Sequence, residues 1–325
     1  MPLLKTSPET MPRKPFPYPV TLPLIAAPMF LISGPELVLA ACGEGVIGAF
    51  PTSNCRTSEA LEEWLRKITS GIERLEREHP GRTIGPWAAT VVTHRTNDRF
   101  EADFELCVKY RAPIVITALG SPARVVAKVH AYGGVVFADV NSVKLARKAA
   151  DCGVDGLVLV SSGAGGHTGE MAGFSFVPSV RQWWDGYIVY AGGVCNGNGI
   201  RAAEVLGADF AYAGTLFIAT EESMADAAYK KLLVDYGPED LVVTKAFTGA
   251  NASMLRPTIV AAGLDPDTLP PRKDMEFRGQ NSENKPWKNI RSAGQGIGMI
   301  DRIKSASTLI GELRSQYAAT LAPGS

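Results

Sequence analysis

The sequence predicts an α/β protein folded as a (β/α)8 barrel, the TIM barrel, with a mainly helical insertion after the last strand. Short apolar runs rich in β-branched residues alternate with longer amphipathic stretches, as parallel strands buried on both faces alternate with helices. Eight such runs, with the stretches between them, extend over about 190 residues, and the whole chain can hold the ~250 residues typical of this barrel. Glycine-rich motifs follow several of the runs, where the loops of such a barrel carry its active site.

Each predicted strand is a short, mostly apolar run set off by glycine, proline or polar residues. A helical stretch lies between most successive runs, which is typical of parallel strands joined by helical crossovers. A doubly wound sheet uses the same elements and is the alternative. The eight runs are residues 24–27, 46–49, 84–91, 114–118, 135–138, 156–160, 187–191 and 210–213.

The helices between these strands are marked by residue spacing and by caps. After the second strand, Thr57 or Ser58 can cap a helix that carries Glu59 in its first turn. Gly153 and Gly207 each stand between an alanine-rich stretch and an apolar run, a weak internal repeat in which both glycines are predicted to end a helix. The apolar residues of the helix after Glu59 follow the spacing of a single face: Leu61, Leu65, Ile68, Ile72 and Leu75.

Two segments lie outside the predicted barrel, which comprises residues 23–220 and 291–325. Residues 1–22 are rich in proline and lack the continuous apolar core of a signal peptide, so we predict an extended N-terminal arm. Residues 221–290 break the rhythm of strands and helices with helical pieces and a polar run that carries several prolines. We predict that this segment is an insertion that forms a lid over the barrel mouth, and that residues 292–317 resume as helix.

The composition disfavours several classes of partner and site. In a chain of 325 residues, 33 basic residues balance 33 acidic ones, which leaves no basic surplus to attract nucleic acid or an anionic membrane. No apolar run approaches the ~20 residues of a membrane-spanning helix. The five cysteines are scattered and form no C-x-x-C pair, so we expect no disulfide framework, no metal site and a cytoplasmic protein. The oligomeric state stays open, a homodimer included.

The motif richest in chemistry follows the sixth predicted strand, where residues 161–169 read Ser-Ser-Gly-Ala-Gly-Gly-His-Thr-Gly. Gly165 and Gly166 allow backbone N–H groups to approach a planar or anionic ligand, because no side chain intervenes. His167 emerges at the end of the strand where the catalytic groups of a barrel collect, so we predict that it is catalytic. A flexible glycine loop with an incidental histidine is the alternative.

Glycine motifs also end the last two predicted strands. Gly192 and Gly193 close the seventh strand, and Ala213, Gly214 and Thr215 close the eighth. The loops after these two strands of a barrel commonly bind phosphate through backbone N–H groups, and the Thr215 hydroxyl adds a donor. A Gly-Gly pair alone is usually a turn, but two such motifs at these positions predict a phosphate site.

Five motifs occur in a fixed order along the chain. They are the Ala27-Pro28-Met29 turn, the Gly-Gly-His-x-Gly loop, the Ala-Gly-Gly strand end, the run from Gly214 to Glu221, and Ser292-Ala293-Gly294-Gln295-Gly296. In this order they resemble the nitronate monooxygenase family, formerly called 2-nitropropane dioxygenases. The resemblance extends from about Pro23 to Ile300.

This resemblance implies a barrel that binds FMN and oxidises alkyl nitronates or nitroalkanes with O2 to a carbonyl compound and nitrite. His167 matches the family histidine that lies over the flavin and serves as a base or as the anchor of the nitro group. The implied cofactor contacts are Ala27, Pro28 and Met29 along the flavin ring, Gly165 and Gly166 beside it, and Gly192, Gly193, Ala213, Gly214 and Thr215 at the phosphate.

The chain departs from the family pattern at three positions where we still expect flavin contacts. Ser161 stands in the stretch where relatives place a glutamine, and Thr90 is the polar residue at the end of the third strand, where relatives often place an asparagine. Asp139 stands where some relatives carry a lysine near the flavin pyrimidine, which disfavours the reduced anionic flavin; a place in the cap region of the next helix is its alternative. These departures leave an NAD(P)H-dependent quinone or enoyl-thioester reductase as the alternative function.

Overall fold

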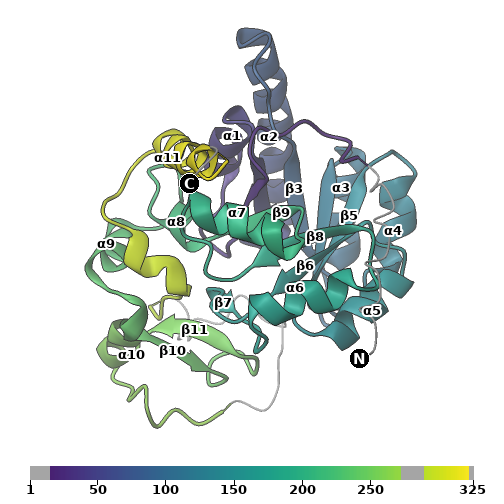
Figure 1. Ribbon diagram of the computed structural model, residues 1–325. Helices are drawn as coiled ribbons and strands as arrows, with labels where there is room; N and C mark the ends of the chain where they lie inside the picture. The colour runs from purple at the N-terminus through teal and green to yellow at the C-terminus, as the bar shows by residue number, and fades with distance from the viewer. Residues whose placement is uncertain (1–14, 272–288, 322–325) are drawn as a thin grey trace, which may run out of the picture.

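The computed structural model describes residues 15–271 and 289–321 of the chain. In this part, eight parallel strands close into a barrel in the order β1-β2-β3-β4-β5-β6-β8-β9, with helices on its outside (Figure 1). The predicted (β/α)8 barrel is therefore confirmed, and the doubly wound sheet, which would keep two open edges, is excluded. The strands are β1 (Leu24–Ala26), β2 (Ile47–Pro51), β3 (Trp87–Val92), β4 (Ile114–Ala118), β5 (Val135–Val140), β6 (Gly156–Val160), β8 (Tyr187–Ala191) and β9 (Phe210–Ala213).

The helices around the barrel begin and end at the residues expected to cap them. The Thr57 hydroxyl accepts the N–H of Ala60 at 3.2 Å and so begins α2. Gly207 ends α7 with φ 108°, and Gly153 stands just after α5 with φ 82°, so both predicted glycines adopt the left-handed conformation. No described helix is both long and apolar enough to cross a bilayer. The helices are α1 (Pro35–Gly43), α2 (Ser58–Glu78), α3 (Phe100–Lys109), α4 (Ala123–His130), α5 (Val143–Asp151), α6 (Gly173–Arg181), α7 (Gly197–Leu206), α8 (Thr215–Ile218) and α11 (Ala306–Ala319).

Two strand boundaries differ from the prediction in ways that matter for the site. The third strand was expected from residue 84, but β3 begins at Trp87, since Pro86 has no N–H to donate to a neighbouring strand. Gly85 lies so close to β2 that a Cβ there would be 2.2 Å from Val46 O. β5 continues two residues beyond its expected end, and Asp139 therefore belongs to the barrel wall.

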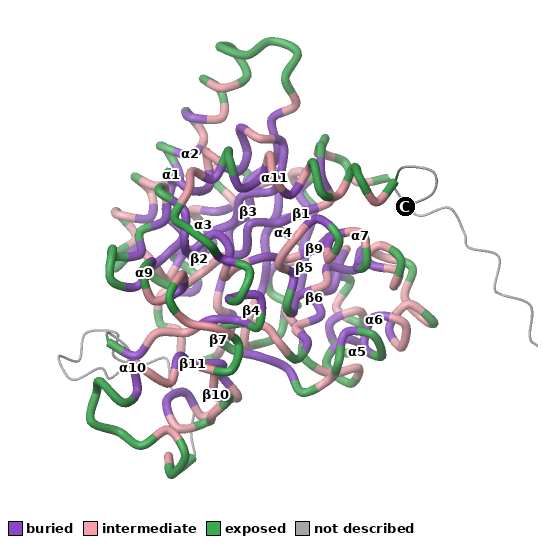
Figure 2. The backbone as a smooth tube through the Cα atoms, turned by 60° about the vertical axis from the view of Figure 1, so that its left-hand side comes forward, coloured by how far each residue is buried: buried purple, intermediate pink, exposed green. Residues whose placement is uncertain are grey.

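The barrel has one apolar core between its wall and the helices and another in its interior, and Figure 2 shows the strands as the buried centre of the molecule. The N-terminal arm closes the end of the interior at which the strands begin. The ring centroid of Phe16 lies 4.8 Å from that of Phe210 and 5.4 Å from that of Tyr187. Residues 15–22 of the predicted arm therefore plug the barrel, and residues 1–14 lie outside the described part of the chain.

The insertion combines helices with a small antiparallel sheet. Its helices α9 (Ala227–Asp235) and α10 (Arg256–Ala261) agree with the prediction, but its strands β10 (Leu241–Thr244) and β11 (Ala252–Leu255) were not predicted. β11 also pairs with β7 (Gly166–His167), a strand within the predicted glycine loop after β6 (Figure 1). The Ala-Ser-Met-Leu sequence of β11 has no β-branched residue, so this strand depends on its two neighbours and carries no local signal.

The segment after the insertion is not the continuous helix predicted for residues 292–317. A short 3-10 helix, η4 (Gln295–Met299), is followed by an irregular stretch, and α11 begins only after Ser305. Three glycines at alternate positions in and before η4 disfavour a longer helix, while the Ser305 hydroxyl accepts the N–H of Thr308 at 3.1 Å and caps α11.

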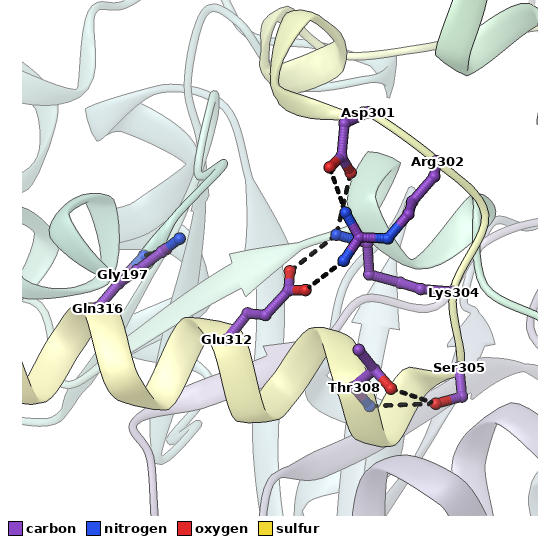
Figure 3. Close-up of polar contacts among 8 residues, drawn as sticks. All are labelled: Gly197, Asp301, Arg302, Lys304, Ser305, Thr308, Glu312 and Gln316. Carbon is purple, nitrogen blue, oxygen red and sulfur yellow. Dashed lines mark hydrogen bonds and ion pairs between the residues drawn. The ribbon is translucent and has the colours of Figure 1, made fainter.

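Polar contacts bind this irregular stretch and the start of α7 to α11 (Figure 3). Glu312 of α11 accepts hydrogen bonds from Arg302 at 2.9 Å and from Lys304 at 2.7 Å. Gln316 Oε1 accepts the N–H of Gly197 at 2.9 Å. The Gly192-Gly193 motif shortly precedes α7 in the chain. The contact between α11 and the start of α7 therefore also helps to fix the predicted phosphate loop.

Candidate functional site

The loops that follow β6 and β9 meet at the carboxyl-terminal end of the barrel, together with the segment before η4. A Cβ added to Gly165 would lie 2.6 Å from Gly294 N and 3.2 Å from Thr215 Oγ1, so these backbones are in close contact. The Thr215 hydroxyl oxygen accepts the N–H of Gly294 at 2.8 Å, and Gly163 O accepts the N–H of Gln295 at 3.0 Å. The structure thus brings two of the predicted glycine motifs together and adds the late Ala-Gly-Gln motif to them.

The turn after β1 borders the same region. The Ala27 N–H donates to Ala213 O at 2.9 Å and joins the end of β1 to the end of β9. A Cβ added to Gly214 would lie 3.4 Å from Met29 Sδ. The predicted ring contact at Met29 and the predicted phosphate contact at Gly214 are therefore neighbours in space.

The predicted cofactor residues differ in accessibility. Ser161 is 0% exposed, and its hydroxyl donates to Leu159 O at 3.3 Å, so it shapes the barrel wall and is not presented to a ligand. Ala27, Gly192 and Ala213 are also buried in this wall. The predicted residues that keep accessible surface are Pro28, Met29, Asp139, Gly165, Gly166, Gly193, Gly214 and Thr215.

His167 is held in place by the insertion. Its backbone pairs with Ala252 of β11, and the next residue is anchored as well, since the Thr168 N–H donates to Asn251 O at 2.9 Å. His167 is an exposed residue, yet the surrounding protein partly desolvates its imidazole and lowers its pKa from the ordinary value of 6.5. The ring is therefore neutral at pH 7 and able to accept a proton.

Three polar side chains face the interior of the barrel from β3, β5 and β9. Thr90, Asp139 and Tyr212 each stand two positions after a residue of the interior core, and side chains two apart in a strand share a face. Thr90 Oγ1, Asp139 Oδ1 and Tyr212 OH are buried without a hydrogen-bond partner among the described residues. Burial raises the pKa of Asp139 to about 7, and burial together with the Asp139 charge raises the pKa of Tyr212 well above 10. Asp139 does not cap α5, because Ser142 does so by accepting the N–H of Leu145 at 3.3 Å.

Asn54, which the sequence did not single out, holds the loop between β1 and α1. Its Nδ2 donates to Met29 O at 3.1 Å and to Ser33 O at 2.8 Å, and its Oδ1 accepts the N–H of Leu31 at 2.7 Å. Leu31 has φ 61°, a left-handed conformation that a non-glycine residue keeps only when its surroundings enforce it. In the sequence, Asn54 looks like an ordinary turn residue, so no local signal marks this role.

We expect Asn54→Ala to lower the free energy of unfolding by about 2–3 kcal/mol, because it removes three hydrogen bonds worth ~1 kcal/mol each. Urea denaturation measures the difference. Asn198→Ala, at an exposed position of α7, is the control and should stay within about 0.5 kcal/mol of the unchanged protein. Equal stabilities of the two variants would show that the loop does not depend on Asn54.

Comparison with protein families and curated proteins gives a consistent result. The family model described as nitronate monooxygenase matches residues 17–316. The chain is 26% identical over 238 residues to the (3aS,4S,5R,7aS)-5-hydroxy-7a-methyl-1-oxo-octahydro-1H-indene-4-carboxyl-CoA dehydrogenase of Rhodococcus jostii, which covers 73% of this chain and 64% of that protein. It is 25% identical over 267 residues to the "Probable nitronate monooxygenase" of Staphylococcus haemolyticus, covering 72% of this chain and 74% of that protein.

Solved structures agree with the fold. The nitroalkane oxidase from Streptomyces ansochromogenes superposes with a TM-score of 0.78 and 22% identity, covering 93% of this chain and 97% of that one. At this identity the likeness establishes the barrel architecture. The chain spans 60% to 64% of the length of the first curated relatives that it matches.

Proposed function

The chain belongs to the nitronate monooxygenase family and is an oxidoreductase, and we propose that it uses FMN to oxidise alkyl nitronates, or nitroalkanes, with O2. The proposed products are a carbonyl compound and nitrite. The observation that carries the proposal is His167, an accessible imidazole that is neutral at pH 7 and fixed in β7 beside the glycine loops. The similarity to the protein named "Probable nitronate monooxygenase" supports the choice of substrate.

The residues at the mouth suit a flavin mononucleotide. Gly166 and Gly193 border open space, since nothing lies within 4 Å of where a Cβ would be, so a ring or a phosphate can approach their backbone. The unpartnered oxygens in the barrel interior suit the polar edge of a ring. When bound, FMN supplies the redox chemistry by taking electrons from the substrate and passing them to O2. We propose contacts to its phosphate from Gly193, Gly214 and Thr215, and contacts to its ring from Pro28, Met29, Gly165 and Gly166.

His167 supplies the proton chemistry in this proposal. The neutral imidazole accepts the proton from the carbon next to the nitro group, and the resulting imidazolium stabilises the nitronate oxygens. Because burial lowers the pKa of His167, the basic form prevails at pH 7. When the substrate is already a nitronate, this proton has left and the ring serves as an anchor.

Residues 272–288 of the predicted insertion, residues 221–290, lie outside the described part of the chain, and we propose that the described part of the insertion acts as a lid. Ser253 of β11 donates through its hydroxyl to Ala293 O at 2.7 Å, and β11 pairs with β7 on the other side. The insertion therefore contacts both the histidine strand and the segment beside Thr215. A lid at this position would exclude water from the carbon of the substrate that reacts.

We expect Thr215→Ala to weaken FMN binding about fivefold to tenfold before it alters the chemistry, because a hydrogen bond contributes ~1 kcal/mol. Quenching of flavin fluorescence during titration of the apoprotein gives the dissociation constant. Thr320→Ala is the control, since the Thr320 hydroxyl also hydrogen-bonds the backbone, donating to Tyr317 O at 2.7 Å at the end of α11. Unchanged FMN binding with lost turnover would contradict the phosphate role of Thr215.

Anaerobic mixing tests the proposed reaction. The purified protein is mixed with a nitronate and, separately, with NADH or NADPH while its visible spectrum is recorded. Bleaching of the yellow colour by the nitronate alone is the expected result. A colourless preparation that cannot be reconstituted with FMN would contradict the assignment as a flavoprotein.

A reductase that uses NAD(P)H on the same barrel is the second candidate, with a quinone or an enoyl thioester as acceptor. The similarity to a protein named as a carboxyl-CoA dehydrogenase favours it, because that name places a CoA thioester on a related chain. Reduction of the bound flavin by NADH or NADPH, but not by a nitronate, in the anaerobic experiment would identify the protein as such a reductase.

A further inference from the structure

Thr90, Asp139 and Tyr212, here called the barrel floor, surround the barrel axis. In the closed strand order, β4 separates β3 from β5, two strands separate β5 from β9, and two more separate β9 from β3. Their side chains therefore converge from three directions. Beneath them the interior is apolar, and the arm closes it with the ring of Phe16.

The barrel floor contains three buried polar atoms without a hydrogen-bond partner among the described residues. Thr90 is 6% exposed, and its hydroxyl, like Asp139 Oδ1 and the Tyr212 hydroxyl, has no hydrogen-bond partner among the described residues. Buried polar atoms in native proteins nearly always have a partner, so three without one that face the same barrel interior indicate a ligand. Since the opposite end is plugged, this ligand enters through the mouth.

The position of Tyr212 relates the barrel floor to the glycine loops. Tyr212 stands two residues before Gly214 and is in register with Ala191, which directly precedes Gly192. A ligand whose phosphate lies at Gly193 and Gly214 therefore has its ring within reach of the barrel axis. Two hydroxyls, which donate and accept, and one carboxyl suit a flat ring with alternating C=O and N–H groups on its edge.

We propose that Thr90, Asp139 and Tyr212 hydrogen-bond the polar edge of the isoalloxazine ring and so fix its orientation over the mouth. This inference rests on the proposed use of FMN. It assigns a binding role to Tyr212, which no sequence motif indicated. The barrel floor contains no cation. When Asp139 is protonated, the proposed hydrogen bonds to this edge of the ring therefore come from uncharged groups.

The protonation state of Asp139 gives the inference a measurable consequence. Burial raises the pKa of this carboxyl to about 7, and the titratable group that senses its charge is Tyr212; no described cation acts on it. An ionised Asp139 is an uncompensated charge in an apolar barrel, so the ring binds the protonated form in preference. Raising the pH from 6 to 8 is therefore expected to weaken binding about tenfold.

The experiment titrates the apoprotein with FMN and with riboflavin between pH 6 and pH 8.5. Riboflavin lacks the phosphate group, which itself titrates in this pH range. The pH dependence of riboflavin binding therefore reports on the ring alone. We expect Tyr212→Phe to weaken both ligands about fivefold to thirtyfold at pH 6. We expect Asp139→Asn to abolish the pH dependence, because the amide does not ionise. Tyr190→Phe is the matched control, a partly buried tyrosine of β8 that packs on the outside of the barrel.

The stability of the apoproteins provides a second readout. Removing a polar atom that has no partner should leave the urea midpoint of Thr90→Val and Tyr212→Phe unchanged or higher, whereas a structural hydroxyl would lower it. Equal flavin binding by Tyr212→Phe and Tyr190→Phe, or a pH dependence that survives in Asp139→Asn, would overturn the role of the barrel floor. An unchanged protein that binds neither flavin would contradict the proposed function instead.

Discussion

His167→Ala should lower the turnover of a neutral nitroalkane by at least about 10²-fold, while turnover of a preformed nitronate falls far less. The difference arises because the imidazole is needed to remove the proton from the nitroalkane, whereas the nitronate has already lost it. Steady-state rates of nitrite release with both forms of the same compound measure the effect. A base is identified by the ratio of the loss of turnover with the nitroalkane to the loss with the nitronate, and not by either loss alone.

The pH dependence of kcat/KM tests the role of His167 as a base in the protein without substitutions. Because burial lowers the pKa of His167 from 6.5, the basic form predominates at pH 7, and kcat/KM for the nitroalkane should level off above that pH. It should fall on acidification through the lowered pKa, and the nitronate profile should lack this step. His79→Ala, at an exposed position after α2, is the control and should match the unchanged protein. Equal losses on both substrates would exclude the role as base.

Gly165→Ala should weaken FMN binding by about tenfold to a hundredfold, because overpacking typically costs ~1–3 kcal/mol. Its Cβ would lie 2.6 Å from Gly294 N and 2.9 Å from the carbonyl carbon of Ala293. Both are backbone atoms, so the loop after β6 must move away and the hydrogen bond between Thr215 and Gly294 is lost. The flavin content after gel filtration and the dissociation constant of the reconstituted protein measure the loss.

Gly81→Ala is a control for this substitution at a glycine outside the proposed site, in the loop between α2 and β3. Gly81 has φ 89°, so alanine there meets the cost of a left-handed conformation, but nothing lies within 4 Å of the added Cβ. We expect FMN binding by Gly81→Ala to match that of the unchanged protein, since local strain is present without a clash at the site. Binding by Gly165→Ala that equals that of Gly81→Ala would show that close contact between the two loops is not required for the cofactor.

The barrel could be predicted from the sequence because its signals are local and repeated. Each strand is a buried run that tolerates few polar residues, and the helices between them carry visible caps, as Thr57 and Gly207 illustrate. The same reasoning missed β10 and β11, whose four-residue sequences become strands by pairing with each other and with β7. Pairing between segments far apart in the chain leaves no periodicity in either one.

Some residues of the candidate site could likewise be predicted from the sequence, and others could not. Glycine motifs indicated the loops, because close backbone approach requires the absence of a side chain, as at Gly165. Asn54 and Tyr212 escaped notice because their roles depend on tertiary contacts or on facing the interior. Tyr212 had one usable signal: within Phe-Ala-Tyr-Ala it occupies the same face as Phe210, so its hydroxyl had to point into the barrel.

The pairing of β7 with β11 constrains how this enzyme can be recombined with its relatives. An engineer who exchanges residues 221–290 as a module also replaces the strand against which His167 is aligned. A donor segment whose β11 differs by one residue in length would shift the pairing and place a different residue of β11 opposite His167. Crossover points that retain Ala252 and Ser253 while varying α9 and α10 keep the histidine in register, so new specificities are best sought there.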